Sequence, residues 1–177
     1  MGQATAAIIA AMLGGATLLH AQTSLFIGAH AVGASFASPS TRTTDAPIGF
    51  SPGVGAHADF AFGNAFGILL ISDNAVQRDH VGDTDLGQWD ALGRFPSISV
   101  GAARTYLTAG LSRNHASTGG DVSPTAGLTG RLPATSRLAI DAGLLWTLGR
   151  FKTSDQKTSQ FVGRVFFGAS YAVFGRR

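Results

Sequence analysis

The 177-residue chain contains no cysteine and no glutamate, and charged residues make up only 13% of it. Without cysteine, disulfides and a lipidated cysteine of the lipoprotein kind are excluded. All ten acidic residues are aspartate, which favours turns and loops, whereas glutamate favours helices. The 13 basic residues are scattered singly except for Arg176 and Arg177. The clustered basic stripe that nucleic-acid binding needs is therefore absent, and no nucleic-acid partner is expected.

Beyond its first 20 residues the chain also lacks any run that approaches the ~20 apolar residues of a membrane-spanning helix. Its mean hydropathy is nevertheless positive, at +0.20, and it contains 12 phenylalanines. This composition is too apolar for disorder and too poor in charge for an average soluble domain. In lipid only helices and closed barrels satisfy every backbone polar group. The composition therefore indicates a protein that crosses a membrane with strands.

The first segment is interpreted as a targeting signal. Residues 4–19 form a short apolar run, ATAAIIAAMLGGATLL, which is followed by small residues suited to cleavage after Ala21. This pattern is typical of a secretory signal peptide, although no lysine or arginine precedes the apolar core. An uncleaved helical anchor is the less favoured alternative because the run is short. We expect a signal peptide over residues 1–21 and one domain over residues 22–177.

The stretch from 161 to 174, FVGRVFFGASYAVF, is the clearest strand. Every second residue is apolar, and the residues between them are mostly small or polar; the apolar set is Val165, Phe167, Ala169, Tyr171 and Val173. A period of two predicts a β-strand with one apolar face and one mixed face. Similar patterns predict seven further strands, at 24–37, 53–62, 65–71, 96–103, 105–113, 123–132 and 137–149.

The predicted connections alternate between long and short along the chain. The long or polar ones are 38–47, 72–94, 114–122 and 150–159, and tight turns such as Gly63–Asn64 lie between them. Outer-membrane barrels have long loops outside and short turns on the periplasmic side. An even number of strands places both ends of the barrel domain on the periplasmic side.

Through this order of strands and connections, the chain resembles the small eight-stranded outer-membrane β-barrel family, of the OmpA transmembrane-domain and opacity-protein kind. The resemblance covers residues 22–177 by pattern rather than by a sharp motif. It implies an all-β, antiparallel, up-and-down transmembrane barrel in the bacterial outer membrane. Members of that family commonly end in an aromatic residue, whereas here Phe174 is followed by three more residues.

The resemblance also implies partners and a role. The expected partners are outer-membrane lipid and lipopolysaccharide, the barrel-assembly machinery, and an extracellular partner that the sequence does not identify. The expected role is structural or one of surface interaction, with displayed loops and a packed rather than porin-like lumen. No cofactor is implied.

Strand parity predicts a polar network inside the barrel, formed by His57, Asp59, Arg131, Asp141 and Arg164. An eight-stranded interior is just wide enough to be filled by side chains. We therefore expect hydrogen bonds and ion pairs there, with Arg131 and Arg164 as partners for the two aspartates. A proton or ion path is the alternative. Interfacial aromatic belts are expected from Phe26, Phe62, Trp146, Phe161 and Tyr171.

Catalysis has one weak candidate, in which His115, Ser117 and Asp121 lie close together in a Gly/Ser-rich segment. The pattern is similar to the His-x-Ser element of outer-membrane lipid A deacylases, but that family uses a glutamate, which this chain lacks. An ordinary loop is the favoured interpretation, and no enzyme activity is expected. Asp83 and Asp85 resemble the start of a calcium loop, but Arg94 stands where a bidentate glutamate is needed. No metal site is predicted.

Two alternatives remain open at this point. A soluble secreted barrel that binds an apolar ligand is the first, and an outer-membrane lipid-modifying hydrolase is the second. A soluble barrel would turn its apolar faces inward. The orientation of Val165, Phe167 and Ala169 relative to the barrel axis therefore discriminates between the soluble and the membrane interpretation.

Overall fold

The computed structural model describes residues 23–37, 50–63, 66–79, 82–114, 122–153 and 156–174. These residues form eight β-strands: β1 (Thr23–Ala37), β2 (Phe50–Phe62), β3 (Phe66–Asp79), β4 (Gly82–Val100), β5 (Ala103–Asn114), β6 (Val122–Pro133), β7 (Leu138–Thr153) and β8 (Gln156–Phe174). Among the described residues no helix is long and apolar enough to cross a membrane.

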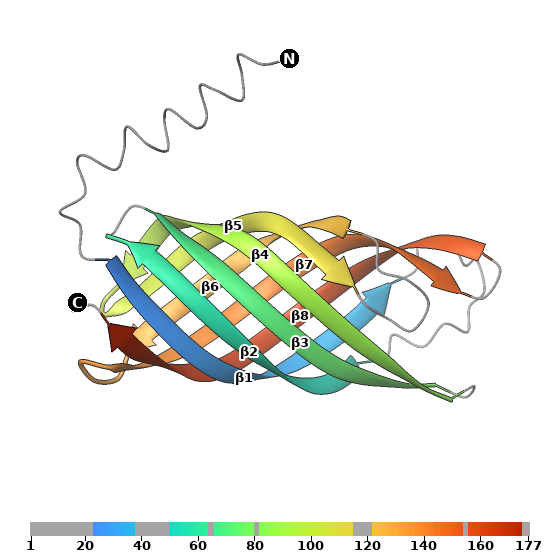
Figure 1. Ribbon diagram of the computed structural model, residues 1–177, viewed down its shortest axis with the longest axis horizontal. Coiled ribbons are helices and arrows are strands. Elements are labelled where there is room, and N and C mark those ends of the chain that lie inside the picture. Colours follow the sequence, from blue (N-terminus) through green and yellow to red (C-terminus); the bar gives the residue numbers. More distant parts are fainter. Residues whose placement is uncertain are drawn as a thin grey trace, which may run out of the picture.

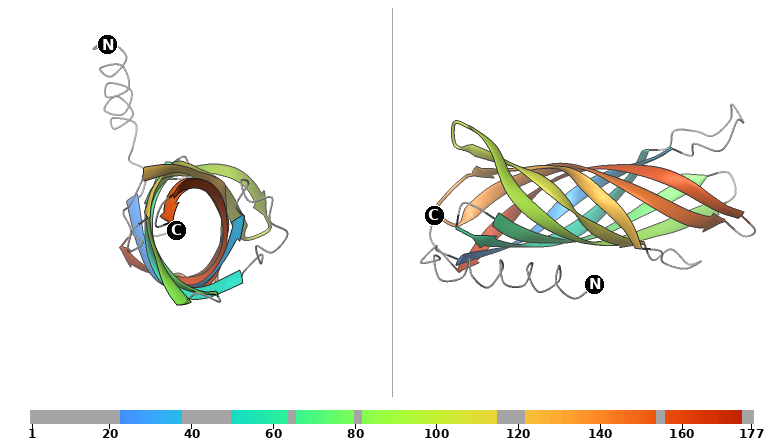
Figure 2. Two further views of the ribbon diagram at one scale, coloured as in Figure 1. Left: turned by 90° about the vertical axis from the view of Figure 1, so that its right-hand side faces the viewer. Right: turned by 90° about the horizontal axis from the view of Figure 1, so that it is seen from above.

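Each strand pairs antiparallel with its neighbours in the chain, and β8 pairs with β1, so the sheet closes into a barrel. The strands are strongly tilted, and the view along the barrel shows a complete ring (Figures 1 and 2). Closure removes every unpaired strand edge along the barrel. The predicted all-β, eight-stranded antiparallel barrel is confirmed.

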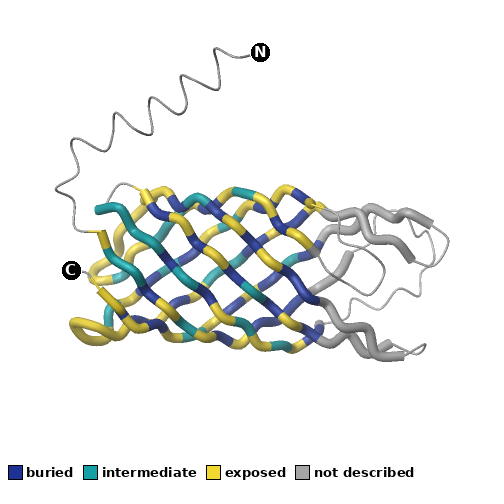
Figure 3. The backbone as a smooth tube through the Cα atoms, in the orientation of Figure 1, coloured by how far each residue is buried: buried dark blue, intermediate teal, exposed yellow. Residues whose placement is uncertain are grey.

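Burial alternates from residue to residue along the strands (Figure 3). On β8 the side chains of Arg164 and Phe166 are buried, whereas Val165 and Phe167 are 53% and 63% exposed. The apolar face therefore points away from the barrel axis and the mixed face points into the lumen. This is the reverse of the arrangement that a soluble barrel requires, and it matches the outward apolar band of membrane barrels.

Three short turns lie at the barrel end where β1 begins and β8 ends (Figure 1). Gly63 follows β2 with a φ of 63°, and Gly101 follows β4 with a φ of 59°, a region that a residue with a Cβ rarely adopts. The third turn, between β6 and β7, is held by the Thr135 hydroxyl, which accepts hydrogen bonds from the backbone N–H groups of Arg137 and Leu138.

The region 72–94 differs from the prediction of a long external loop. β3 continues to Asp79, β4 already begins at Gly82, and the two strands are paired over this length. The fourth strand, predicted at 96–103, therefore starts earlier and ends at the turn around Gly101. Polar residues misled the sequence interpretation, because Gln88, Asp90 and Arg94 face the lumen, where a polar side chain fits.

The predicted loop at 150–159 is also largely strand, because β7 extends to Thr153 and β8 begins at Gln156. Asp83 and Asp85 likewise lie within β4 rather than in a loop. Residues 1–22, 38–49 and 115–121 lie outside the described residues. The signal peptide and the loops expected at 38–47 and 114–122 therefore stay predictions.

Candidate functional site

The lumen contains a continuous chain of charged side chains. Near one end lies Asp59, which is fully buried and contacts both Arg94 and Arg131. The Arg131 Nη1 lies 2.5 Å from a carboxylate oxygen of Asp59. Both guanidinium groups also lie over aromatic rings, with Arg94 3.7 Å from the centroid of Tyr106 and Arg131 4.0 Å from that of Phe26. Each cation is therefore held by an acid and a π-face.

Asp141 continues this chain from β7. Its Oδ1 accepts a hydrogen bond from Arg131 Nε at 2.7 Å, and its Oδ2 accepts from His57 Nε2 at 3.3 Å and from the Ser170 hydroxyl. Arg131 thus joins two carboxylates, Asp59 and Asp141, that belong to strands β2 and β7. An ion pair linking non-adjacent strands fixes their relative positions across the lumen.

Arg164 joins a second pair of carboxylates. Its Nη1 lies 2.6 Å from Asp73 on β3 and 2.8 Å from Asp90 on β4. Both aspartates were absent from the predicted network because the region around them was interpreted as a loop. Beyond Asp90 the contacts become uncharged and link Gln88, Ser112, Thr125 and Thr147 by hydrogen bonds.

Two histidines connect the two halves of the network. His30 Nδ1 lies 3.1 Å from His57 Nδ1, and the opposite nitrogen of each ring faces an aspartate. The distance from His30 Nε2 to Asp73 Oδ1 is 2.6 Å. The complete order of side chains is thus Asp90, Arg164, Asp73, His30, His57, Asp141, Arg131, Asp59 and Arg94.

His30 was missing from the predicted network, yet the sequence contains a signal for it. The tetrapeptide Gly-Ala-His-Ala occurs twice, at 28–31 and 55–58. In the antiparallel β1–β2 pair the two copies face each other, so that Gly28 is opposite His57 and His30 is opposite Gly55. Each ring therefore extends over a glycine of the other strand. A Cβ added to Gly55 would collide with His30 Nε2 and Asp73 Oδ1.

Apolar side chains fill much of the rest of the described lumen, and six of them form one cluster: Val32, Leu69, Ile71, Leu92, Leu145 and Phe166. A cavity of about 10 Å³ remains beside His57, Arg94 and Arg131. That volume is about the minimum that one water molecule occupies. The described lumen is thus packed by ion pairs, by uncharged polar side chains and by apolar contacts.

The expected aromatic belt needs one correction. Phe26 is 4% exposed and lies inside the barrel against Arg131, because strand parity on β1 directs it inward with His30. Trp146 and Tyr171 face outward, and Arg137 Nη1 donates a hydrogen bond to the Tyr171 hydroxyl at 2.8 Å. The side chain of Phe161 lies outside the described residues.

Phe62 belongs to an outward group of three aromatic rings, of which the sequence analysis predicted only Phe62. Its ring stacks on Phe66 at a centroid distance of 6.0 Å, and Phe66 lies 5.5 Å from Phe95. The three rings come from β2, β3 and β4 near the short turns. Phe95 was missed because the fourth strand was predicted to begin only at residue 96, whereas β4 begins at Gly82. That aromatic rings such as these mark the membrane interface stays a prediction.

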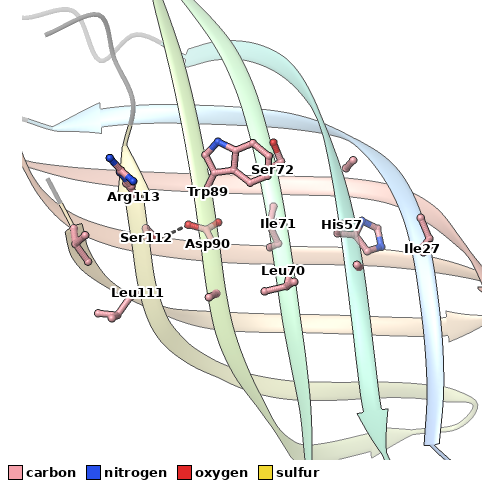
Figure 4. Close-up of a pocket in the computed structure, with 14 residues that line it drawn as sticks. Ile27, His57, Leu70, Ile71, Ser72, Trp89, Asp90, Leu111, Ser112 and Arg113 are labelled. Carbon is pink, nitrogen blue, oxygen red and sulfur yellow. Dashed lines mark hydrogen bonds between the residues drawn. The ribbon is translucent and has the colours of Figure 1, made fainter. Parts of the chain in front are cut away.

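The outer face carries a shallow depression of about 780 Å³ (Figure 4). Its lining combines small side chains on β2 and β4 with larger apolar side chains such as Leu70, Trp89 and Leu111. Arg113 lies opposite Trp89 in the β4–β5 pair and is exposed. All four aspartates whose side chains are described are buried. Among the described residues, the outer face therefore presents arginine side chains but no aspartate side chains.

The catalytic candidates His115, Ser117 and Asp121 lie outside the described residues, so the structure does not place them relative to one another. Within the described ranges no group of three or more histidines and acids has the geometry to hold a metal ion.

No family model and no curated protein matches the chain. Solved structures do match it. OprG of Pseudomonas aeruginosa aligns at 12% identity and a TM-score of 0.58, covering 86% of this chain and 96% of that one. Neisserial surface protein A aligns at 15% identity and a TM-score of 0.58, covering 84% and 97%. Ail of Yersinia pestis, in complex with the heparin analogue sucrose octasulfate, aligns at 15% identity and a TM-score of 0.52, covering 85% and 97%.

These matches extend over nearly the full length of the similar barrels, and their low identity makes them evidence for the fold. They agree with the closed antiparallel barrel of eight strands described above. This chain therefore has the fold of the small eight-stranded outer-membrane β-barrels.

Proposed function

We propose that this protein is an outer-membrane β-barrel with a structural or surface-interaction role and a lumen closed to ions. The observation that supports the proposal best is the segregation of side chains in the barrel. Outward residues such as Val54, Leu111 and Phe167 are more than half exposed, whereas every described aspartate is buried. In water such a surface would drive association, while in a bilayer it contacts acyl chains.

Membrane insertion is tested by fractionation and by gel migration. The protein should fractionate with the outer membrane, stay folded in detergent, and migrate differently on a gel with and without heating. A monomer that stays soluble at high concentration without detergent would disprove the proposal.

The closed lumen is supported by the ion pairs and, among the described residues, by the small size of the cavity beside His57, Arg94 and Arg131. An open pore needs a continuous water path, whereas here guanidinium groups and carboxylates contact each other directly across the lumen. Reconstituted protein should show little steady conductance in planar bilayers. Stable porin-like conductance would contradict the sealed lumen without affecting the proposed location.

We also propose that the depression around Trp89 contacts a phosphate-bearing lipid of the outer leaflet, such as lipopolysaccharide. Its apolar lining suits an acyl chain, and Arg113 provides a cation on a face without described acids. Native mass spectrometry of barrels released from lipopolysaccharide-containing nanodiscs should show less bound lipid for Arg113→Gln. Arg104→Gln, which changes an exposed arginine near the opposite end of β5, is the control. Equal retention by both variants would argue against this contact.

A further inference from the structure

We infer that His30 and His57 form a proton-binding site in the lumen, in which the two rings together hold three ring protons and one positive charge. The inference concerns the barrel interior and does not depend on the proposed location or surface role. It rests on the hydrogen-bond geometry of the pair and on the charge balance of its surroundings.

The outer nitrogens of the pair determine two of the three protons. His30 Nε2 faces Asp73, and His57 Nε2 faces Asp141. Each of these carboxylates also accepts from an arginine: Asp73 from Arg164 and Asp141 from Arg131. Carboxylates in contact with guanidinium groups are ionised and act only as acceptors. Both Nε2 atoms must therefore carry a proton and donate it.

The inner nitrogens determine the third proton. The two Nδ1 atoms lie 3.1 Å apart, which is a hydrogen-bond distance. Two unprotonated nitrogens would place their lone pairs against each other, and two protonated ones would place two N–H groups against each other. One proton between them makes the contact favourable. The ring that carries it is protonated on both nitrogens and is a cation.

The charge balance gives the same answer independently. Four described aspartates are buried in the barrel, and three described arginines are buried with them: Asp59, Asp73, Asp90 and Asp141 against Arg94, Arg131 and Arg164. One negative charge remains, 4 − 3 = 1. A buried net charge that no opposite charge compensates is costly, even where each carboxylate contacts an arginine. With one positive charge on the histidine pair, negative and positive charges alternate along the whole order of described side chains.

The groups that face the pair come from several strands. Asp73 on β3 and Asp141 on β7 contact the rings directly, while Arg131 on β6 and Arg164 on β8 contact those carboxylates. The Phe166 ring lies 4.9 Å from His30 and covers the pair on another side. The proton is thus enclosed by two acids, two arginines and an aromatic ring.

Nitrogen-15 NMR of histidine-labelled protein, folded in detergent near pH 7, tests the proton count. His30→Gln and His57→Gln assign the signals of the two rings. We expect three nitrogen-bound ring protons in the pair, one of them coupled to both Nδ1 atoms. Two protons, with both rings neutral, or four, with both rings charged, would overturn the inference.

A rescue experiment tests the charge balance. The double variant His30→Gln with His57→Gln should lower the urea midpoint of unfolding, because one negative charge is then unbalanced. Adding Asp73→Asn should recover part of that loss, since Arg164 keeps Asp90 as a partner. Adding Asp59→Asn instead is the control, and it should lower the midpoint further because Asp59 is an ion-pair partner of both Arg94 and Arg131. A double variant as stable as the parent, or no recovery with Asp73→Asn, would contradict the inference.

Discussion

The lumen and the outer surface are built from the same eight strands, but their side chains contribute to stability in different ways. On β6, Arg131 depends on partners from β2 and β7, whereas its outward neighbour Leu132 needs only an apolar solvent. Changes in the lumen should therefore be partner-dependent and non-additive. Changes on the outer surface should depend on depth in the bilayer and add independently.

Breaking the lumen network at Asp141 should have the largest effect. Asp141→Leu leaves His57, Arg131 and Ser170 without a shared acceptor, and losing one member of a buried ion pair typically costs about 3–5 kcal/mol. Urea unfolding in detergent, followed by the gel shift, measures the loss. The double variant Asp141→Leu with Arg131→Met should recover part of it, because Asp59 still has Arg94. A double variant less stable than Asp141→Leu alone would contradict this coupling.

A charge on the outer surface should have the next largest effect. Leu128 lies near the middle of β6 and is 46% exposed. Leu128→Arg should cost about 2–4 kcal/mol in lipid vesicles, because arginine at the bilayer midplane is poorly solvated. Val100→Arg, at the turn end of β4, is the control and should cost about 0–1 kcal/mol. Equal costs for both variants would contradict the interpretation that Leu128 lies deeper in the bilayer than Val100.

Two glycines, one facing the lumen and one facing outward, test how closely the side chains are packed on each side of the barrel wall. A Cβ on the inward Gly143 would collide with the Phe166 ring, so Gly143→Ala should destabilise the barrel by about 1–3 kcal/mol. Gly163→Ala would place its methyl group 3.8 Å from the outward Trp146, an ordinary contact, and should leave stability nearly unchanged. Thermal unfolding in detergent measures both. A tolerated Gly143→Ala would mean that the lumen is less closely packed than the structure indicates.

The smallest effect is expected at the rim of the barrel. Arg137→Gln removes the exposed hydrogen bond to Tyr171, where water can replace the lost donor. The unfolding midpoint should match that of the parent within experimental error. A clear loss of stability would show that this rim contact contributes to the barrel as the lumen contacts do.

The strands that the sequence predicted well are those whose inward residues are small or sparsely charged. On β8 the alternation between Val165, Phe167 and their buried neighbours is visible in the sequence. On β4 the same alternation exists, with Trp89 and Phe95 outward, but Gln88, Asp90 and Arg94 resemble a solvated loop. Polarity does not distinguish a lumen from water, because both provide polar partners.

The candidate site was predicted only in part for the same reason. Parity placed Arg131 and Asp141 on inward faces, and they are direct neighbours in the β6–β7 register. Asp73 and Asp90 were missed together with their strand segments. The Gly-Ala-His-Ala repeat was present in the sequence, but its meaning depends on the antiparallel register that places His30 opposite Gly55.

The sequence by itself determined the period of two, the apolar face of each clearly alternating strand and the number of strands, because these depend on residues close together in the chain. Only the tertiary structure decided which inward side chains meet. Arg164 and Asp73 are 91 positions apart, and His57 and Asp141 are 84 apart. Such contacts depend on strand tilt and on the closure between β1 and β8, which set heights and distances across the lumen.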